Sequence, residues 1–151
     1  MSKQIKSQNE SRNPSVMINT KFWAKYDQIA NPQGSEKNKQ NFLFQRMVDL
    51  FMLSLVHGFK EGLKASLPSA KKDIFRWSNF KESDEIIINA ISILDTTTDT
   101  KSDPKIINSK VARLKIIQEY ANGGFLDLIK KLEDGPDFEA NFITLLTDEL
   151  E

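Results

Sequence analysis

The residues that could do chemistry are few and include a single histidine. The sequence contains one histidine, His57, and no cysteine, which excludes thiolate catalysis, cysteine-ligated zinc and a relay between two histidines. His57 lies in a strongly apolar stretch, and Glu61 follows four residues later, a spacing that puts both on one helix face. We therefore predict a packing histidine that pairs with Glu61, and no Ser-His-Asp arrangement.

Carboxylates are frequent in the second half but do not form a metal-binding pattern. Asp95, Asp99 and Asp103 are spaced by four in a stretch that we expect to be a loop, whereas a calcium loop has ligands at alternate positions, a glycine at the sixth and a glutamate at the twelfth. No GxxxxGK[ST] or GxGxxG pattern is present, and Gly123-Gly124 follows an expected helix, which favours a helix cap. We expect no enzymatic activity, no metal and no cofactor.

Basic side chains give the clearest functional signal. Residues 1–81 hold 14 Lys and Arg against 6 Asp and Glu, a net charge of +8, and residues 82–151 hold 7 against 15, a net charge of −8. Separated basic side chains can neutralise phosphates with little dependence on base sequence. Alternatively, two opposite patches neutralise each other within the fold or between subunits. The candidate DNA-binding residues are Arg12, Lys21, Lys25, Lys37 and Lys39.

The elements that must position these residues are mainly helical. Residues 1–15 are polar and predict a flexible tail, followed by a single compact helical domain over residues 16–151. A short strand is expected at 16–18, and Asn19 or Thr20 is expected to cap the first helix. About six helices are predicted, at residues 21–30, 42–64, 83–94, 105–121, 125–132 and from 137 onward, with an aromatic connector at 74–80.

Two of these helices have faces that matter for assembly. The helix over 42–64 is apolar on nearly all sides, so it is buried or forms an interface, and Gly58 and Gly62 allow another helix to approach closely. The candidate partner or oligomer interface residues are Phe51, Phe59 and Trp77. The expected core face of the helix over 83–94 consists of Ile86, Ile87, Ala90, Ile91 and Leu94.

The location of the protein follows from its apolar segments. No apolar run approaches 18 residues, and the polar N-terminus lacks the apolar segment of a signal peptide. We expect a cytoplasmic protein with no membrane contact.

Three segments together carry a resemblance to a known family. They are Val56-His57-Gly58-Phe59-Lys60-Glu61-Gly62, Ile74-Phe75-Arg76-Trp77-Ser78-Asn79-Phe80 and Ile117-Gln118-Glu119-Tyr120-Ala121-Asn122-Gly123-Gly124. In this order they resemble the small accessory proteins of DNA phosphorothioation (Dnd) gene clusters, the Dnd-system-associated protein 4 family, over about residues 16–146. The resemblance implies a role in bacterial host defence, beside ATPases and nucleases that restrict unmodified or foreign DNA.

Three functions remain open at this point. The first is a non-enzymatic accessory subunit of an antiphage restriction system that bridges double-stranded DNA, through the basic half, to a larger protein subunit, through the acidic half. The second is a DNA-binding regulator, because the strand–helix–long helix order is similar to a ribbon–helix–helix dimer, whose paired strands enter DNA. The third is an adaptor between proteins, and each of the three is compatible with a homo-oligomer.

Overall fold

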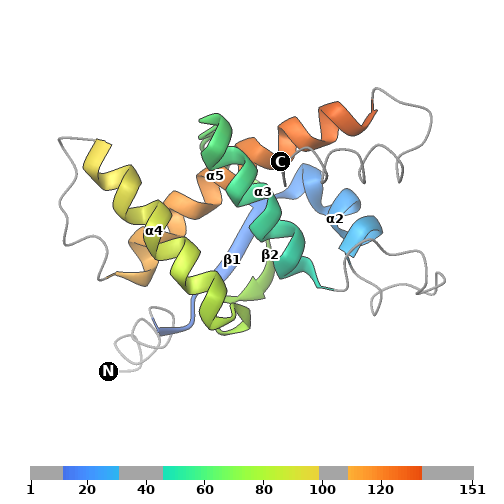
Figure 1. Cartoon of the computed structure of the whole chain (residues 1–151). Helices are drawn as coiled ribbons and strands as arrows, with labels where there is room; N and C mark the ends of the chain where they lie inside the picture. Colours follow the sequence, from blue (N-terminus) through green and yellow to red (C-terminus); the bar gives the residue numbers. More distant parts are fainter. Residues whose placement is uncertain (1–11, 31–45, 99–108, 134–151) are drawn as a thin grey trace.

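The computed structural model describes residues 12–30, 46–98 and 109–133, which form four α-helices and one small sheet (Figure 1). The order of elements is β1 (Ser15–Asn19), η1 (Thr20–Phe22), α2 (Trp23–Ala30), α3 (Met47–Glu61), β2 (Lys71–Arg76), η3 (Trp77–Asn79), α4 (Glu82–Thr98) and α5 (Lys110–Glu133). The prediction of a mainly α fold with a short N-terminal strand is confirmed, but about six helices was an overestimate. The helix expected from residue 137 lies outside the described residues.

The sheet pairs the N-terminal strand with a segment from the middle of the chain. β1 and β2 are antiparallel, and Ser15 pairs with Arg76 at one end while Asn19 pairs with Lys71 at the other. Val16 and Ile18 point into the core. The expected aromatic connector at 74–80 is therefore the second half of β2 followed by η3. In a ribbon–helix–helix dimer the strand pairs with its copy, whereas here β1 pairs within its own chain.

The centre of the fold is the crossing of α3 and α5, where glycines bring the two backbones together. A Cβ atom on Gly58 of α3 would collide with the carbonyl oxygen of Tyr120 on α5. A Cβ atom on Gly124 of α5 would collide with the carbonyl oxygen of Ser54 on α3. Side chains at these positions would therefore push the helices apart.

This crossing corrects two expectations about glycine. Gly123-Gly124 does not end a helix, so the helices expected at 105–121 and 125–132 belong to one helix, α5, which runs across the molecule (Figure 1). Gly62 is not part of the crossing but ends α3 in the left-handed conformation, with φ of 68°. Glycine reaches that region without the steric cost of a Cβ atom.

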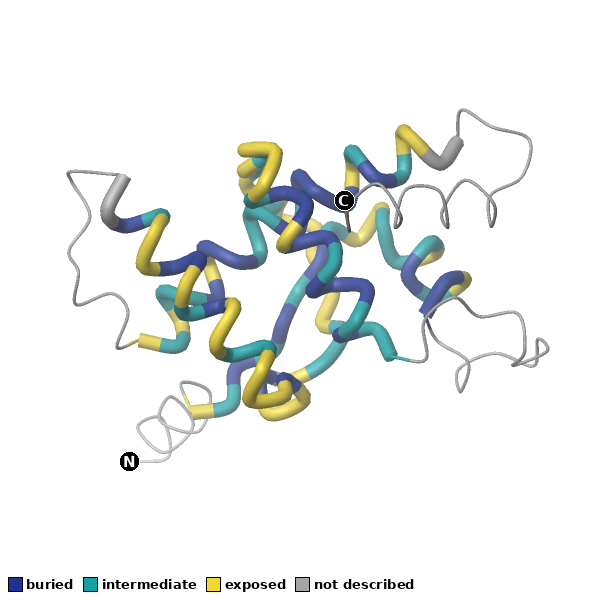
Figure 2. Tube along the Cα trace, in the orientation of Figure 1, coloured by how far each residue is buried: buried dark blue, intermediate teal, exposed yellow. Residues whose placement is uncertain are grey.

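The core lies between the sheet, α3 and α5, and α3 is buried along most of its length (Figure 2). Phe51 of α3 contacts the rings of Phe75 and Phe80 at centroid distances of 5.5 and 6.1 Å. Phe80 in turn contacts the ring of Trp77 at 5.3 Å, and the Trp77 indole N–H donates to Glu85 of α4 at 3.0 Å. This aromatic cluster holds β2 and η3 against α3 and connects them to α4.

The orientation of α4 differs from the expectation. Ile91 is buried as predicted, together with Ile88, but the other four residues of the expected core face are exposed. These are Ile86, Ile87, Ala90 and Leu94. The helix also continues past its predicted end at residue 94 to Thr98, so Asp95 is helical. Asp99 and Asp103 lie outside the described residues. None of the described helices has the length and apolar character needed to cross a bilayer.

Candidate nucleic-acid interface

Three lysines from distant parts of the sequence meet where β1 ends and β2 begins. Asn19, the last residue of β1, pairs with Lys71, and its side chain accepts the Lys21 backbone N–H at 3.0 Å, which caps η1 as predicted. The Lys72 ammonium lies 4.4 Å from the ring centroid of Trp23, a cation–π contact that holds this side chain over the start of α2. We name Lys21, Lys71 and Lys72 the basic cluster.

Arg12 lies at the opposite end of β1. Its carbonyl oxygen accepts a hydrogen bond from the Lys110 ammonium at 2.9 Å, and the Arg76 guanidinium donates to the neighbouring Asn13 carbonyl at 3.3 Å. A strand of five residues spans about 17 Å, so Arg12 and Lys21 do not form one compact site. Instead, Arg12, Arg76 and Lys110 form a second basic group at the start of the strand. Residues 12–15, which we had expected to belong to the tail, therefore contact the folded part of the chain.

An open groove of about 360 Å³ lies between these two groups, along the outer face of β1 and the first half of α5. Exposed Lys71 and Lys115 line it, and Glu119 is the only acidic residue among its lining residues. The remaining lining residues are Ser15, Met17, Ser66, Leu67, Val111, Leu114 and Gln118. We name basic strip the seven cations of β2, of the segments that flank β1 and of the first turns of α5, although the adjacent Lys71 and Lys72 point to opposite faces of the sheet. They are Arg12, Lys21, Lys71, Lys72, Arg76, Lys110 and Lys115.

Two residues of this strip, Arg12 and Lys21, are among the DNA-binding residues predicted from the sequence. Of the other predicted DNA-binding residues, Lys25 is half-buried on α2, and Lys37 and Lys39 lie outside the described residues. The missed members belong to β2 and the first turns of α5, elements that only the tertiary fold brings beside β1. Their signal in the sequence is the pair Lys71-Lys72, which contributes to the net positive charge of residues 1–81.

The predicted interface residues are mostly enclosed. Phe51 is fully buried and Trp77 is 2% exposed, so both belong to the core of this chain. Phe59 is half-buried, with its ring edge-to-face against Tyr120 at 5.4 Å. Of these three residues, only Phe59 offers surface to another molecule.

His57 is buried in a structural contact. Its Nε2 lies 2.7 Å from an Asp127 carboxylate oxygen of α5, which also contacts the Lys131 ammonium at 3.1 Å. The hydrogen bond from His57, followed by the contribution of Lys131, lowers the pKa of the Asp127 carboxyl below its usual value of 3.8. The prediction of a packing histidine fits this site, where the contact of Nε2 is with Asp127 of α5; the predicted partner, Glu61, is exposed. The His57 side chain has no exposed surface.

The Glu-Tyr-Ala-Asn-Gly-Gly segment of α5 has a structural role. The Tyr120 hydroxyl donates to Asp95 of α4 at 2.7 Å, and Asp95 also pairs with Lys64 at 3.2 Å. Burial, reinforced by Asp95, raises the pKa of Tyr120 to about 12. The Asn122 amide donates to the carbonyl oxygens of Ala65 and Ser66, each at 3.2 Å. The segment thus ties α5 to α4 and to the chain that follows α3.

Together these features define a small, mainly helical protein with a basic strip along its sheet and no catalytic constellation among the described residues. Residues 33–151 match the family described as DNA sulphur modification system-associated protein 4, and the chain belongs to that family. The match begins after α2, so it includes Lys71 and Lys72 but not Lys21. No curated protein and no solved structure matches the chain.

Proposed function

We propose that this protein is a non-enzymatic accessory subunit of a bacterial DNA-defence system. That system is a restriction system linked to DNA phosphorothioation, or a related one. It binds double-stranded DNA through the basic strip and a larger ATPase or nuclease subunit through the acidic half, residues 82–151. The assignment of the protein to such a system is supported by its membership of the family of DNA sulphur modification system-associated protein 4. The DNA contact rests on the basic strip.

The observation that carries the DNA contact is the meeting of Lys21, Lys71 and Lys72 at one end of the sheet. The basic strip comprises seven cations. Two acidic residues lie near them, Asp73 on β2 and Glu119 in the groove. Lysine and arginine side chains at separate positions neutralise phosphates and release counterions, which gives affinity with little sequence preference.

The ribbon–helix–helix alternative receives less support from the same strand. One side of β1 pairs with β2, and on β1 the Met17 backbone N–H donates to the Gln118 side chain of α5 at 2.8 Å. A second copy could add to β1 only along the edge that β2 leaves free, and the Gln118 side chain contacts the backbone of β1. Base reading by an intermolecular ribbon is therefore not the function that we propose.

The proposal is tested by charge reversal within the basic cluster. In Lys21→Glu with Lys71→Glu, we expect at least a tenfold loss of affinity for a random duplex at low salt, measured by fluorescence anisotropy. The matched control is Lys60→Glu with Lys130→Glu, which makes the same change in net charge at exposed lysines of α3 and α5 outside the strip. Circular dichroism verifies that both variants fold. Equal losses in the two variants would show that only net charge matters, and no binding by the wild-type chain would favour the pure adaptor.

A further inference from the structure

The groove beside β1 has a lining that phosphate binding alone does not explain. Exposed Lys71 and Lys115 could each meet a phosphate, but four of the other lining residues are apolar. These are Met17, Leu67, Val111 and Leu114. Val111 is 54% exposed, so the apolar surface is accessible from solvent. Apolar walls with a few charged groups are typical of a site for a ligand that is itself partly apolar and carries the opposite charge.

One segment of this chain has that composition. Residues 134–151, which follow α5, include six acidic side chains and no basic one. The acids form two groups of three, which are Asp134, Asp137 and Glu139, and then Asp148, Glu149 and Glu151. Residues 140–147 between them carry no charge and are mostly apolar. The segment is therefore acidic, apolar and acidic again along its length.

The basic strip has the complementary order. Cations gather at both ends of β1, and the groove lies between the two groups. With Asp73 and Glu119 counted against its seven cations, the strip has a net charge of +5, which is close in magnitude to the six negative charges of the segment. The apolar stretch 140–147 laid over the groove would bring three acids toward each basic group, where opposite charges attract.

The segment is long enough to return along α5. This helix ends at Glu133, and Lys115, in the middle of the groove wall, lies about 27 Å back along the helix axis. The middle of the stretch 140–147 follows Glu133 by about ten residues, which span up to about 33 Å when extended. The stretch can therefore reach the groove of its own chain, running antiparallel to α5.

We propose that residues 134–151 occupy the groove of the free protein, with the stretch 140–147 against Met17, Val111 and Leu114 and with the acids beside the cations of the basic strip. A segment of the same chain acts at a high effective concentration, so it competes with DNA for these cations. A larger subunit that binds the acidic half would then release the groove for DNA. This regulation rests on the proposed function, whereas the docking of the segment does not.

The absence of cysteine in the chain allows a direct test of where the segment lies. Full-length Val111→Cys with Leu146→Cys, treated with a short bismaleimide without DNA, is expected to form an intramolecular cross-link that keeps the monomer mass of 17.3 kDa. The control is Ile86→Cys with Leu146→Cys, because Ile86 is an exposed aliphatic residue of α4 outside the groove. We expect the Val111 pair to react about tenfold faster than the control. Equal rates, or products of twice the monomer mass alone, overturn the proposal.

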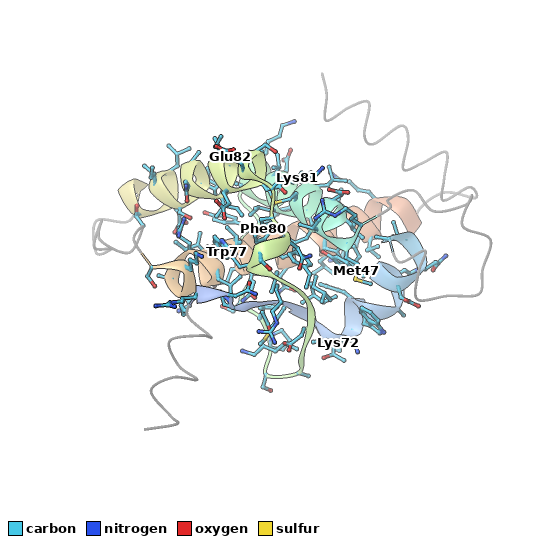
Figure 3. The ribbon with its side chains drawn as sticks, turned by 90° about the horizontal axis from the view of Figure 1, so that it is seen from below. Met47, Lys72, Trp77, Phe80, Lys81 and Glu82 are labelled. Atoms are coloured by element: carbon cyan, nitrogen blue, oxygen red, sulfur yellow. The ribbon has the colours of Figure 1, made fainter. Side chains whose placement is uncertain are left out.

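Neutralisation of the segment tests its competition with DNA. In full-length Glu149→Gln with Glu151→Gln, we expect the affinity for a random duplex at low salt to rise about threefold or more, measured by fluorescence anisotropy. The matched control is Glu61→Gln with Glu82→Gln, the same change in net charge at exposed glutamates outside the strip and the groove. Glu82 lies on the opposite side of the molecule from Lys72 (Figure 3).

The two experiments separate the docking from the proposed function. Equal gains in affinity in the two neutralised variants would show that only net charge matters, and would overturn the competition. The cross-link is measured without DNA, so its absence overturns the docking whether or not the protein binds DNA. A chain that cross-links as expected but binds no duplex, even after neutralisation, contradicts the proposed function and supports the docking.

Discussion

At the scale of single residues, partners separated by long stretches of sequence decide what a polar side chain does. The spacing of four residues suggested Glu61 as the partner of His57, because local geometry is all that a sequence shows. In the fold, the crossing of α3 and α5 places Asp127 within 2.7 Å of the histidine, 70 residues away in sequence. That the histidine would be structural could be inferred from its apolar neighbours, but its partner could not.

The pH dependence of stability tests the role of Asp127. A carboxyl whose pKa is lowered by folding stabilises the protein at pH values above its unfolded pKa, and this contribution disappears as the pH falls through the folded pKa. We expect Asp127→Asn to unfold more easily than the wild type at and above about pH 5, and the difference to shrink in more acidic solution. Urea unfolding at a series of pH values measures it. A difference that grows on acidification would contradict the assignment.

Phe51 provides the residue-scale test of the core. Its side chain is fully buried and contacts two other rings, so Phe51→Ala should lower the free energy of unfolding by about 3–5 kcal/mol. Val56→Ala on the exposed side of the same helix is the control, with an expected change within about 0.5 kcal/mol. Equal effects of the two substitutions in thermal or urea unfolding would mean that the orientation of α3 is wrong.

At the scale of elements, sequence patterns located most helices but not how they meet. The helices at 21–30, 42–64 and 83–94 could be predicted from apolar spacing, because apolar residues three and four positions apart share one helix face in any tertiary fold. The two glycines of α5 instead predicted the end of a helix, since glycine is unfavourable inside a helix and frequent at its end. Their advantage, the close approach of Gly124 to Ser54 of α3, exists only after the chain has folded. β2 was missed for a similar reason, because Lys71 and Lys72 do not alternate with apolar residues.

The glycine crossing can be tested by adding one methyl group. Alanine is favoured over glycine in an isolated helix by about 1 kcal/mol. Gly124→Ala is nevertheless expected to destabilise the protein by about 1–3 kcal/mol, because its Cβ atom would collide with the Ser54 carbonyl oxygen and overpack the crossing. Urea unfolding monitored by circular dichroism gives the value.

The control for this substitution is Gly62→Asn, at the end of α3. Asparagine tolerates the left-handed conformation, and nothing lies within 4 Å of a Cβ atom there, so we expect a smaller loss than for Gly124→Ala. If Gly124→Ala instead stabilises the protein, the two helices do not depend on glycine for their approach.

At the scale of the whole molecule, the charge split of the sequence becomes a spatial arrangement that the sequence alone did not define. The fold gathers the basic side chains of β2, and of the first turns of α5, along β1, although α5 belongs to the acidic half. It also leaves apolar residues of α4 exposed on the side opposite Lys72. Periodicity could show that α4 is a helix, but a helix with two apolar faces has no unique inward side until its neighbours are known. The central claim is that the basic strip contacts phosphates.

The salt dependence of duplex binding tests that claim most directly. We expect the logarithm of the wild-type affinity to fall linearly with the logarithm of salt concentration between about 50 and 200 mM, on duplexes of different random sequences alike. Lys21→Gln with Lys71→Gln should reduce the magnitude of this slope by about two, since each lost phosphate contact removes roughly one released ion. A folded double variant with the wild-type slope and affinity would contradict the account and exclude the basic cluster as the DNA contact.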